Sequence, residues 1–538
     1  MVPTHSVTNQ APPLEDHHPW RIDRSLKLAV AREGAEWAFP SLDQLSQRIG
    51  SPEVIRWGVE ANENPPVLHT HDRYGRRIDE VRFHASYHQL MALSVESGLH
   101  AGPWADERAG AHVARAAGFY LAAQNELGHG CPISMTYSVV PALKHQPDVA
   151  AEWLPRITAR KYDPRFLPAA EKSGVLFGMA MTEKQGGSDV RANTTRAVDA
   201  GDGTWRITGH KWFCSAPMCD AFLMLAQTAT GLSCFLVPRW LPDGTLNRFF
   251  IQRLKNKLGN KSNASSEIEL SDTVGWKVGE EGRGVPTILD MATHTRLDCV
   301  IGSSGMMRQA LVLAMHHAKH RAAFGRPLIA QPAMQAVLAD LALESEAATQ
   351  FMVRLAAAYD RNTPDAVAFR RIATPIGKYY VCKRAIAHVA EAMECLGGAG
   401  YVEDFPFARL HRETPLYSVW EGSGNVIALD VLRALHRQPA TAEVLFAEIR
   451  EAKGNATLDA FVDDLQRALA EASQDEGQAR WLVDALARAL QASLVVRFSS
   501  SEMSDAFLAT RLHGGSGTFG ALPAAVDRRA ILGQVWEE

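Results

Sequence analysis

The middle of this chain interrupts a helical pattern with a block of β-prone runs, and this interruption constrains the fold most. Over residues 25–172 apolar side chains recur mostly at helical spacing, as in the Ala-rich stretch 110–119. Over residues 174–283 the runs become short and β-prone, as in 232–238, and turn residues separate them. Helical spacing returns from residue 286 onward. The pattern therefore predicts a β-domain between helical parts.

The helical pattern after residue 286 divides into two parts. Turn residues at 324–327 and 397–400 interrupt the first part, and the last hundred residues carry further amphipathic stripes. We therefore predict an α+β fold made of four domains. These are an N-terminal helical domain (1–178), a central β-barrel or sandwich domain (179–285), a helical bundle domain (286–440) and an extra C-terminal helical domain (441–538).

Composition excludes several classes of protein. The 538 residues are enough for three or four domains, and 56 Lys and Arg against 60 Asp and Glu leave a net charge of -4. Because the chain has no basic excess, any site for a polyanion would have to be local. Seven scattered cysteines without a CxxC pair indicate reduced thiols. With no signal-peptide pattern and no apolar run of membrane-spanning length, we expect a soluble, cytoplasmic protein that does not bind membranes.

A Gly-rich segment at Met181–Asp189 follows a strand-like run at Gly174–Ala180. Its glycines bring backbone N–H groups close to an anion or to the edge of a ring, and Thr182 and Ser188 add hydroxyl donors. A surface turn at the end of a strand is the simpler interpretation of such a segment taken alone.

A second segment, Trp420–Asn425, places one carboxylate, Glu421, beside small residues that expose the backbone. With apolar Val419 and Trp420 next to it, Glu421 is placed to act as a general base. A single glutamate before a Gly turn is more often solvated or capping. Taken together, the two Gly-rich segments suggest a base that faces a bound cofactor.

Two other patterns suggest sites that we do not predict. His316, His317 and His320 share a helical face, but no cysteine or acidic residue lies near them in the sequence, so we predict no metal site. The run Gly515–Gly520 has the form GxGxxG, but it follows a helical stretch and leaves no room for a βαβ unit. We therefore interpret it as a chance match.

The two Gly-rich segments resemble the signatures of the acyl-CoA dehydrogenase superfamily. In these flavoproteins a glutamate removes the α-proton of an acyl-CoA thioester while hydride leaves the β-carbon for flavin N5. The resemblance implies that Glu421 is the catalytic base and that FAD is bound. It implies FAD contacts at Met181, Thr182, Gly187, Ser188, Trp420, Gly422, Ser423 and Asn425.

Three further segments resemble elements of the same family. Gly209–Ser215 resembles its flavin-packing strand, with Phe213 where tryptophan is usual and Ser215 where threonine is usual. A strand that packs into its own core is the alternative. Arg321–Gly325 resembles an element that reaches the FAD of a neighbouring subunit in tetramers, which implies contacts from Arg321 and Phe324. A basic helix end is the other explanation for the arginine.

The turn at Gly397 and Gly398 resembles a second, nucleotide-facing signature, although a helix C-cap is commoner for such a sequence. Arg296 matches a family arginine near the CoA moiety, with Thr293 where many members carry aspartate. These matches add Arg296 as a substrate contact and the two glycines as cofactor contacts.

Three features resemble the AidB-like branch, the adaptive alkylation-response branch of the superfamily. They are the N-terminal segment with Asn64-Pro65-Pro66 and residues 71–84, and the particular residues found in each of the two signatures. The resemblance implies a homotetramer, weak acyl-CoA dehydrogenase activity and double-stranded DNA binding by the C-terminal domain. Residues 431–538, however, hold eleven Lys and Arg against fifteen Asp and Glu. Their net charge of -4 does not favour DNA binding.

Three functions follow from the sequence. The first is an FAD-dependent acyl-CoA dehydrogenase that passes electrons to an electron-transferring flavoprotein or a similar acceptor. The second is a DNA-associated protein of the alkylation-damage response with residual dehydrogenase activity. The third is an oxidase in which dioxygen is the acceptor. The acyl chain is not identified by these residues.

Overall fold

The computed structural model describes residues 4–513 and 517–536. Contacts between residues divide the chain into two units. Unit 1 comprises Met1–Pro52, His112–Asn125 and Cys299–Glu538, and unit 2 comprises Glu53–Ala111 and Glu126–Asp298. Each unit therefore combines segments that lie far apart in the sequence, and the four consecutive domains stay a prediction.

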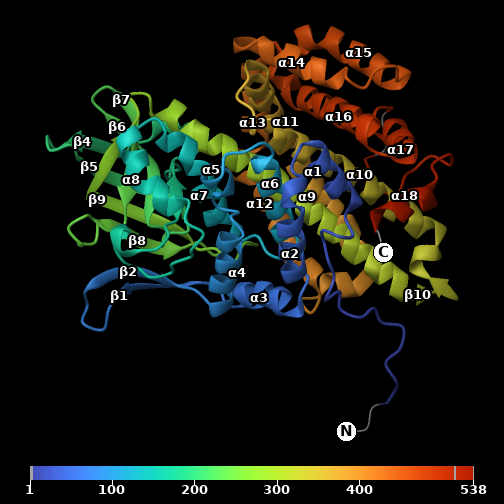
Figure 1. Ribbon diagram of the computed structural model, residues 1–538, viewed down its shortest axis with the longest axis horizontal. Coiled ribbons are helices and arrows are strands. Elements are labelled where there is room, and N and C mark those ends of the chain that lie inside the picture. Colours follow the sequence, from blue (N-terminus) through green and yellow to red (C-terminus); the bar gives the residue numbers. More distant parts are fainter. Residues whose placement is uncertain (1–3, 514–516, 537–538) are drawn as a thin grey trace. The chain divides into compact units, whose positions relative to one another are not determined.

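Unit 2 is built around a seven-stranded sheet, drawn mainly in green in Figure 1. Its strands run in the order β3-β6-β4-β5-β9-β7, β8 pairs with β9, and a further pairing of β6 with β7 closes a ring. The predicted central β-barrel is thus present. The strands are β3 (Phe177–Ala180), β4 (Arg196–Asp199), β5 (Trp205–Ser215), β6 (Ala221–Thr228), β7 (Gly231–Pro238), β8 (Phe249–Leu254) and β9 (Ser265–Val278).

The apolar composition of β6 and β7 explains why both strands are buried in the middle of the barrel. Residues 221–226 of β6 and 232–238 of β7 are buried without alternation. A strand covered on both faces reads as a continuous apolar run, and these two segments have that composition. All seven cysteines of the chain are buried and none forms a disulfide.

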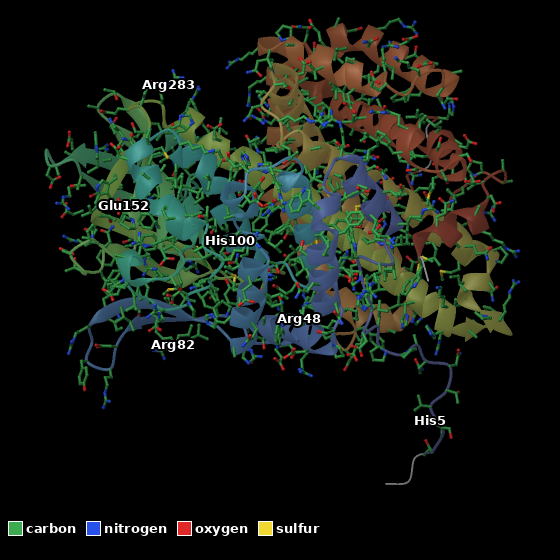
Figure 2. The ribbon with its side chains drawn as sticks, in the orientation of Figure 1. His5, Arg48, Arg82, His100, Glu152 and Arg283 are labelled. Atoms are coloured by element: carbon green, nitrogen blue, oxygen red, sulfur yellow. The ribbon has the colours of Figure 1, made fainter. Side chains whose placement is uncertain are left out.

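Helices and a separate hairpin complete unit 2. The stretch that the sequence pattern marked as mostly helical also contains the antiparallel hairpin β1 (Val67–His71) and β2 (Arg77–Arg82), which the pattern missed. Arg82, Glu152 and Arg283 are exposed on this unit, whereas His100 is buried in it (Figure 2). The helices are α3 (Pro52–Glu63), α4 (Ala85–Glu96), α5 (Gly102–Ala105), α7 (Gly130–Leu143), α8 (Pro147–Ile157), η2 (Ala169–Glu171), η3 (Val190–Ala192) and the first part of α9 (Gly284–His320).

Unit 1 is helical, with α10 and α11 at its centre. From Leu338 to Ala357 almost every residue of α10 is buried, as expected of a helix that other helices surround. The elements before α12 are α1 (Arg24–Arg32), η1 (Glu36–Ala38), α2 (Phe39–Ile49), α6 (Ala111–Ala123), the rest of α9, β10 (Ala322–Ala323), β11 (Arg326–Pro327), η4 (Leu328–Ala330), α10 (Pro332–Ala357), α11 (Pro364–Glu394) and η5 (Gly397–Tyr401).

Most of the C-terminal helices of unit 1, orange to red in Figure 1, pack on α10 or α11, and the remaining one, α15, packs on α16. The remaining elements are α12 (Pro406–Val419), α13 (Gly424–Arg437), α14 (Ala440–Ile449), α15 (Ala456–Ala472), η6 (Glu476–Gln478), α16 (Ala479–Phe498), α17 (Ser501–Arg511) and α18 (Arg528–Val535). Of the GxGxxG run, residues 515 and 516 lie outside the described residues. Its described part, 517–520, connects α17 to α18 and contains no strand.

Candidate active site

The first Gly-rich segment leaves the barrel at the end of β3 and folds back on itself. Thr182 accepts a backbone hydrogen bond from Trp212 of β5 through its carbonyl oxygen (2.8 Å). A Cβ atom on Gly187 would lie only 2.3 Å from the hydroxyl oxygen of Thr182. Glycine is therefore required at 187, because the loop closes directly on Thr182. The structure brings these two predicted flavin contacts together, beside Met181 and Ser188.

A buried ion pair fixes this loop to β5. The Lys211 ammonium lies 2.9 Å from a Glu183 carboxylate oxygen, and neither side chain is exposed. Burial alone would raise the pKa of Glu183, but the Lys211 charge and hydrogen bonds from Thr195 and Thr194 outweigh it and lower the pKa to about 2. We had not singled out either residue. One signal was available, because the Gly-rich segment contains Glu183 and the aromatic segment contains Lys211, two residues of opposite charge.

The end of β5 presents Phe213 and Ser215. Between Lys211 and Cys214 the register of β5 against β9 shifts, as in a β-bulge. Phe213 is 50% exposed there, which excludes the alternative of an aromatic residue packed into its own core. Ser215 lies within 3.3 Å of the hydroxyl of Ser265. Bulges of this kind re-aim side chains next to functional sites, and here the Phe213 ring is exposed while Ser215 is half-buried.

Arg296 lies on the first part of α9 and is half-buried. Thr293, one turn earlier, donates its hydroxyl to the carbonyl of Leu289 (2.8 Å). At this position a threonine bonds to the backbone of its own helix, whereas an aspartate would offer a negative charge.

In unit 1, Glu421 lies in the four-residue linker that joins α12 to α13. It is half-buried with φ of +58°, and Gly422 follows with φ of +108°. A left-handed conformation costs about 1–2 kcal/mol for a residue with a Cβ atom, so the surrounding structure must enforce it. Lys378, a buried residue of α11, donates a hydrogen bond to the Gly422 carbonyl oxygen.

The start of α13 offers an anion site next to this linker. Ser423 is the N-cap but makes no side-chain capping bond. A Cβ atom on Gly424 would lie 2.9 Å from the Lys383 ammonium, so this glycine lets the helix start lie against a cation. Burial lowers the pKa of Lys383, and the nearby charges of Arg480 and Lys378 lower it further. Helix N–H groups with clustered cations suit a pyrophosphate.

Trp420 offers a hydrogen-bond donor to a ligand. Among the described residues, no acceptor lies within hydrogen-bond distance of its indole nitrogen, although that atom is buried. Buried donors of this kind normally have a partner. The linker, the start of α13 and this indole group thus fit a flavin nucleotide, with Trp420, Gly422, Ser423 and Asn425 as the residues that would hold it.

Gly397 and Gly398 do not lie at this linker. They form η5, which packs on α11 and α12, before the start of α12, whereas Glu421 follows its end. A helix of this length spans about 20 Å. Gly397 has φ of +59°, and Cβ atoms on both glycines would meet nothing within 4 Å. The two segments are therefore separate within one chain.

Arg321 and Phe324 form another separate group, at a tight turn after α9. Phe324 is 97% exposed and has φ of +53°. Arg321 donates to the carbonyl of Asn9 (2.5 Å), and the Asn9 side chain pairs with the backbone of Ala322 (2.7 and 2.8 Å). Gln331 braces the same turn through the Ala323 carbonyl (2.9 Å). The turn is thus held by the N-terminal segment and presents an aromatic ring.

Two of the three histidines singled out on α9 contact backbone carbonyl oxygens through their side chains. His316 bonds to the carbonyl of Pro12 (2.8 Å), and His320 bonds to the carbonyl of His316 (2.8 Å). Over residues 4–513 and 517–536, no three His, Cys, Asp or Glu side chains are grouped to hold a metal ion. Within the same residues, no helix is long and apolar enough to span a bilayer.

The sequence matches models of known protein families. Three family models match in succession: the N-terminal domain of the adaptive response protein AidB at residues 9–164, the middle domain of acyl-CoA dehydrogenases at 178–273, and their C-terminal domain at 282–436. The matched segments contain the loop after β3, the end of β5 and the linker with Glu421. They define a flavoprotein of the acyl-CoA dehydrogenase class.

Individual similar proteins indicate the branch of the family to which the chain belongs. AidB of Escherichia coli (strain K12), named as a candidate acyl-CoA dehydrogenase, is 47% identical over 479 residues, which are 88% of each chain. Acyl-CoA dehydrogenase family member 11 of Caenorhabditis elegans is 28% identical, over 91% of this chain and 84% of the relative. The solved structure of C. elegans ACDH-11 in complex with C11-CoA matches with a TM-score of 0.85 and 26% identity, covering 94% and 92% of the two chains. The chain belongs to the acyl-CoA dehydrogenase family, in its AidB-like branch.

Because the family homologues are FAD-dependent flavoproteins, the cofactor of this protein is FAD. Taken separately, each unit contains residues that fit one part of that group. Unit 2 provides an exposed ring and hydroxyls suited to the isoalloxazine, and unit 1 provides cations and a helix start suited to the pyrophosphate.

Proposed function

We propose that this protein is an acyl-CoA dehydrogenase in which Glu421 removes the α-proton of a CoA thioester. When bound, FAD supplies the acceptor for the β-hydride at its N5 atom. The observation that carries the proposal is the strained backbone conformation of Glu421, in the linker between two helices. Lys378 holds this linker through a hydrogen bond to the Gly422 carbonyl oxygen. Strain of this kind is maintained where a side chain must be aimed.

The remaining roles follow from the residues of the two units. Thr182, Ser188 and Ser215 would donate hydrogen bonds to the polar edge of the flavin, and Phe213 would cover one face of the ring. Arg296 would hold an anionic part of CoA. The exposed Phe324, next to Arg321, would contact the cofactor of a second copy of the chain in a homotetramer. An electron-transferring flavoprotein would accept the electrons.

Exchange of the α-proton tests the base separately from hydride transfer. The FAD-loaded protein is incubated with an acyl-CoA in deuterated water, and deuterium at the α-carbon is measured by mass spectrometry. The wild type should exchange the α-proton, and Glu421→Gln should exchange it at least 100-fold more slowly, within the range for removal of a general base. A Glu443→Gln variant, changed in α14, serves as the control and should exchange normally. Equal rates in all three proteins would refute the role of Glu421.

Double-stranded DNA binding by the C-terminal helices receives less support. Arg450 pairs with Asp463 at 2.7 Å, and Arg433 lies near Asp430 at 3.9 Å. Cations that are already paired release fewer counterions from DNA. The charge pattern favours an enzyme over a DNA-associated protein, and salt-sensitive DNA binding that is lost on changing Arg528 and Arg529 would reverse this order.

A further inference from the structure

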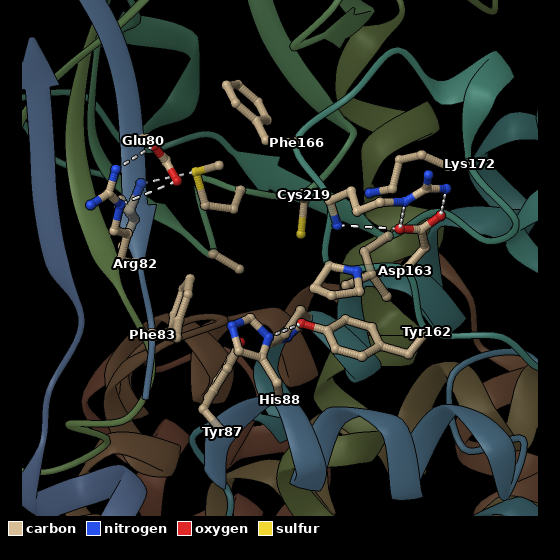
Figure 3. Close-up of a pocket in the computed structure, with 17 residues that line it drawn as sticks. Glu80, Arg82, Phe83, Tyr87, His88, Tyr162, Asp163, Phe166, Lys172 and Cys219 are labelled. Atoms are coloured by element: carbon tan, nitrogen blue, oxygen red, sulfur yellow. Dashed lines mark hydrogen bonds and ion pairs between the residues drawn. The ribbon is translucent and has the colours of Figure 1, made fainter. Parts of the chain in front are cut away.

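A cavity of about 390 Å³ lies within unit 2. Its walls come from β2, the start of α4, the loop 162–166, and the segment 216–219 that follows β5. None of the predicted flavin contacts lines it. Figure 3 shows Phe83, Tyr87 and His88 on one side of the open centre, with Phe166, Cys219 and Lys172 on the other. A cavity of this size is in the range of small-molecule sites.

Aromatic side chains form much of the wall. Phe83 stacks on Tyr87 with ring centroids 4.2 Å apart and an interplanar angle of 13°. Phe166 packs edge-on against Trp240 at 5.4 Å, and this contact fixes the position of its ring. Met218 also lines the cavity, and its sulfur accepts the N–H of Val81. Such walls suit a flat ring, which can stack on Phe83 or Phe166 and contact the polarizable sulfur.

Every charge that lines the cavity is already paired. Arg82 lies 3.3 Å from Glu80 and Arg165 lies 2.6 Å from Asp163. Lys172 forms the third pair, with Asp220 behind the wall, at 2.7 Å. An ionic ligand would bring an unmatched charge into this neutral setting, which is unfavourable. The occupant should therefore be uncharged.

Two groups remain as hydrogen-bond donors toward the open centre. The Lys172 ammonium has three N–H groups and, among the described residues, uses one of them on Asp220, although its side chain is only 5% exposed. His88 lies with Nδ1 2.7 Å from the Tyr162 hydroxyl. When this hydroxyl donates to Nδ1, the neutral ring carries its proton on Nε2, which can donate to a ligand. Burial lowers the pKa of His88 and raises that of Tyr162, which favours the neutral form of each group. A ligand oxygen that accepts hydrogen bonds complements them.

The backbone beside the cavity is also unusual. Ala216 lines the wall with φ of +49°, a left-handed conformation that a residue with a Cβ atom rarely adopts. Its N–H bonds to the Ala264 carbonyl (2.7 Å), and its own carbonyl accepts from Cys219 (2.9 Å). Strained residues of this kind concentrate at ligand sites.

We propose that this cavity is a second ligand site, which binds an uncharged aromatic molecule carrying an amide or ketone oxygen. The ring lies between Phe83 and Phe166, and the oxygen accepts hydrogen bonds from Lys172 and His88. The site shares no lining residue with the proposed catalytic site.

Calorimetric titration of the FAD-loaded protein with two isosteric probes tests the site. 2-Naphthamide is neutral and 2-naphthoate carries a negative charge on the same frame. The amide should bind at least about tenfold more tightly, because the anion finds no unpaired cation. No binding of the amide, or equal or tighter binding of the naphthoate, would overturn the proposal.

Variants locate the binding. Phe166→Leu should weaken amide binding about threefold to tenfold through loss of the ring contact, while the matched Phe250→Leu, outside the cavity, should leave it unchanged. Lys172→Met should weaken it about tenfold; if this variant does not fold, the phenylalanine pair decides the question. Unchanged affinity in Phe166→Leu would overturn the proposal. Normal amide binding by Glu421→Gln would separate this site from the proposed catalytic one.

Discussion

At the scale of single residues, the site depends on buried charges that hold loops in place. Glu183 and Lys211 join the loop after β3 to β5, and the Glu183 carboxylate also accepts from the backbone of Thr194 and Thr195. A buried ion pair contributes little net stability compared with apolar residues, but it fixes one arrangement of the groups around it. Here the groups it fixes are the loop with Thr182 and the strand with Phe213.

Removing one partner of this pair should be costly. Glu183→Gln leaves the Lys211 ammonium buried without its counter-charge, so we expect a loss of about 3–5 kcal/mol in the free energy of unfolding. Urea denaturation followed by fluorescence measures it. Asp272→Asn breaks an exposed pair with Arg248, and that loss should stay below about 1 kcal/mol. Equal losses in the two variants would contradict the structural role of the buried pair.

At the scale of elements, a charge cluster attaches α17 to the centre of unit 1. Arg511 of α17 bonds to Glu344 of α10 at 2.7 Å and also to Asp340, while Arg384 of α11 bonds to Glu344 at 3.0 Å. Burial alone would raise the pKa of Glu344, but the two arginines lower it to about 2. The cluster therefore ties the C-terminal helices to the acyl-CoA dehydrogenase bundle.

Arg511→Met should loosen this attachment. Two carboxylates would remain with only Arg384, and we expect a loss of about 3–5 kcal/mol together with faster proteolysis around α17. Limited proteolysis with mass spectrometry identifies where cleavage occurs. Arg467→Met, which breaks an exposed pair on α15, is the matched control and should behave as the wild type. Protection of α17 in the Arg511 variant would show that apolar contacts suffice.

The sequence pattern anticipated local elements better than contacts between distant ones. The loop after β3 and the linker with Glu421 each arise from a short Gly-rich run, so turn chemistry predicts them. The end of β5 was predicted only from its resemblance to a family strand, and its bulge was not predicted. The hairpin β1–β2 was missed because the helical periodicity around it dominated a long window. The ion pair of Glu183 and the cavity beside β2 could not be found, because pattern alone does not say which distant side chains meet.

At the scale of the whole molecule, four buried groups and the half-buried His17 make stability depend on pH. The pKa values of Glu126, Glu183 and Glu344 are about 2, against an ordinary 4.5. Those of His17 and His388 are about 4, lowered mainly by burial from 6.5. In each case the unfolded chain binds protons more readily than the folded chain, so stability falls as pH falls.

Acid denaturation should accordingly proceed through two windows. From about pH 6.5 to 4 the unfolded chain gains protons at the two histidines, and His388 alone accounts for about 3 kcal/mol. From about pH 4.5 to 2 the three glutamates add a further loss. Melting temperatures measured between pH 8 and 3 test this, and His388→Gln should flatten the upper window. An unchanged slope between pH 6.5 and 4 in that variant would contradict the assignment.

The absorbance of FAD under anaerobic conditions tests the central claim most directly. The wild type and Glu421→Gln, both loaded with FAD, are titrated with a straight-chain and a short branched acyl-CoA. We expect the flavin band of the wild type to bleach with at least one thioester, and that of the variant to stay oxidised at the same concentrations. A variant that bleaches as fast as the wild type, or a wild type that stays oxidised with every thioester, would contradict the assignment of Glu421 as the base of a working dehydrogenase.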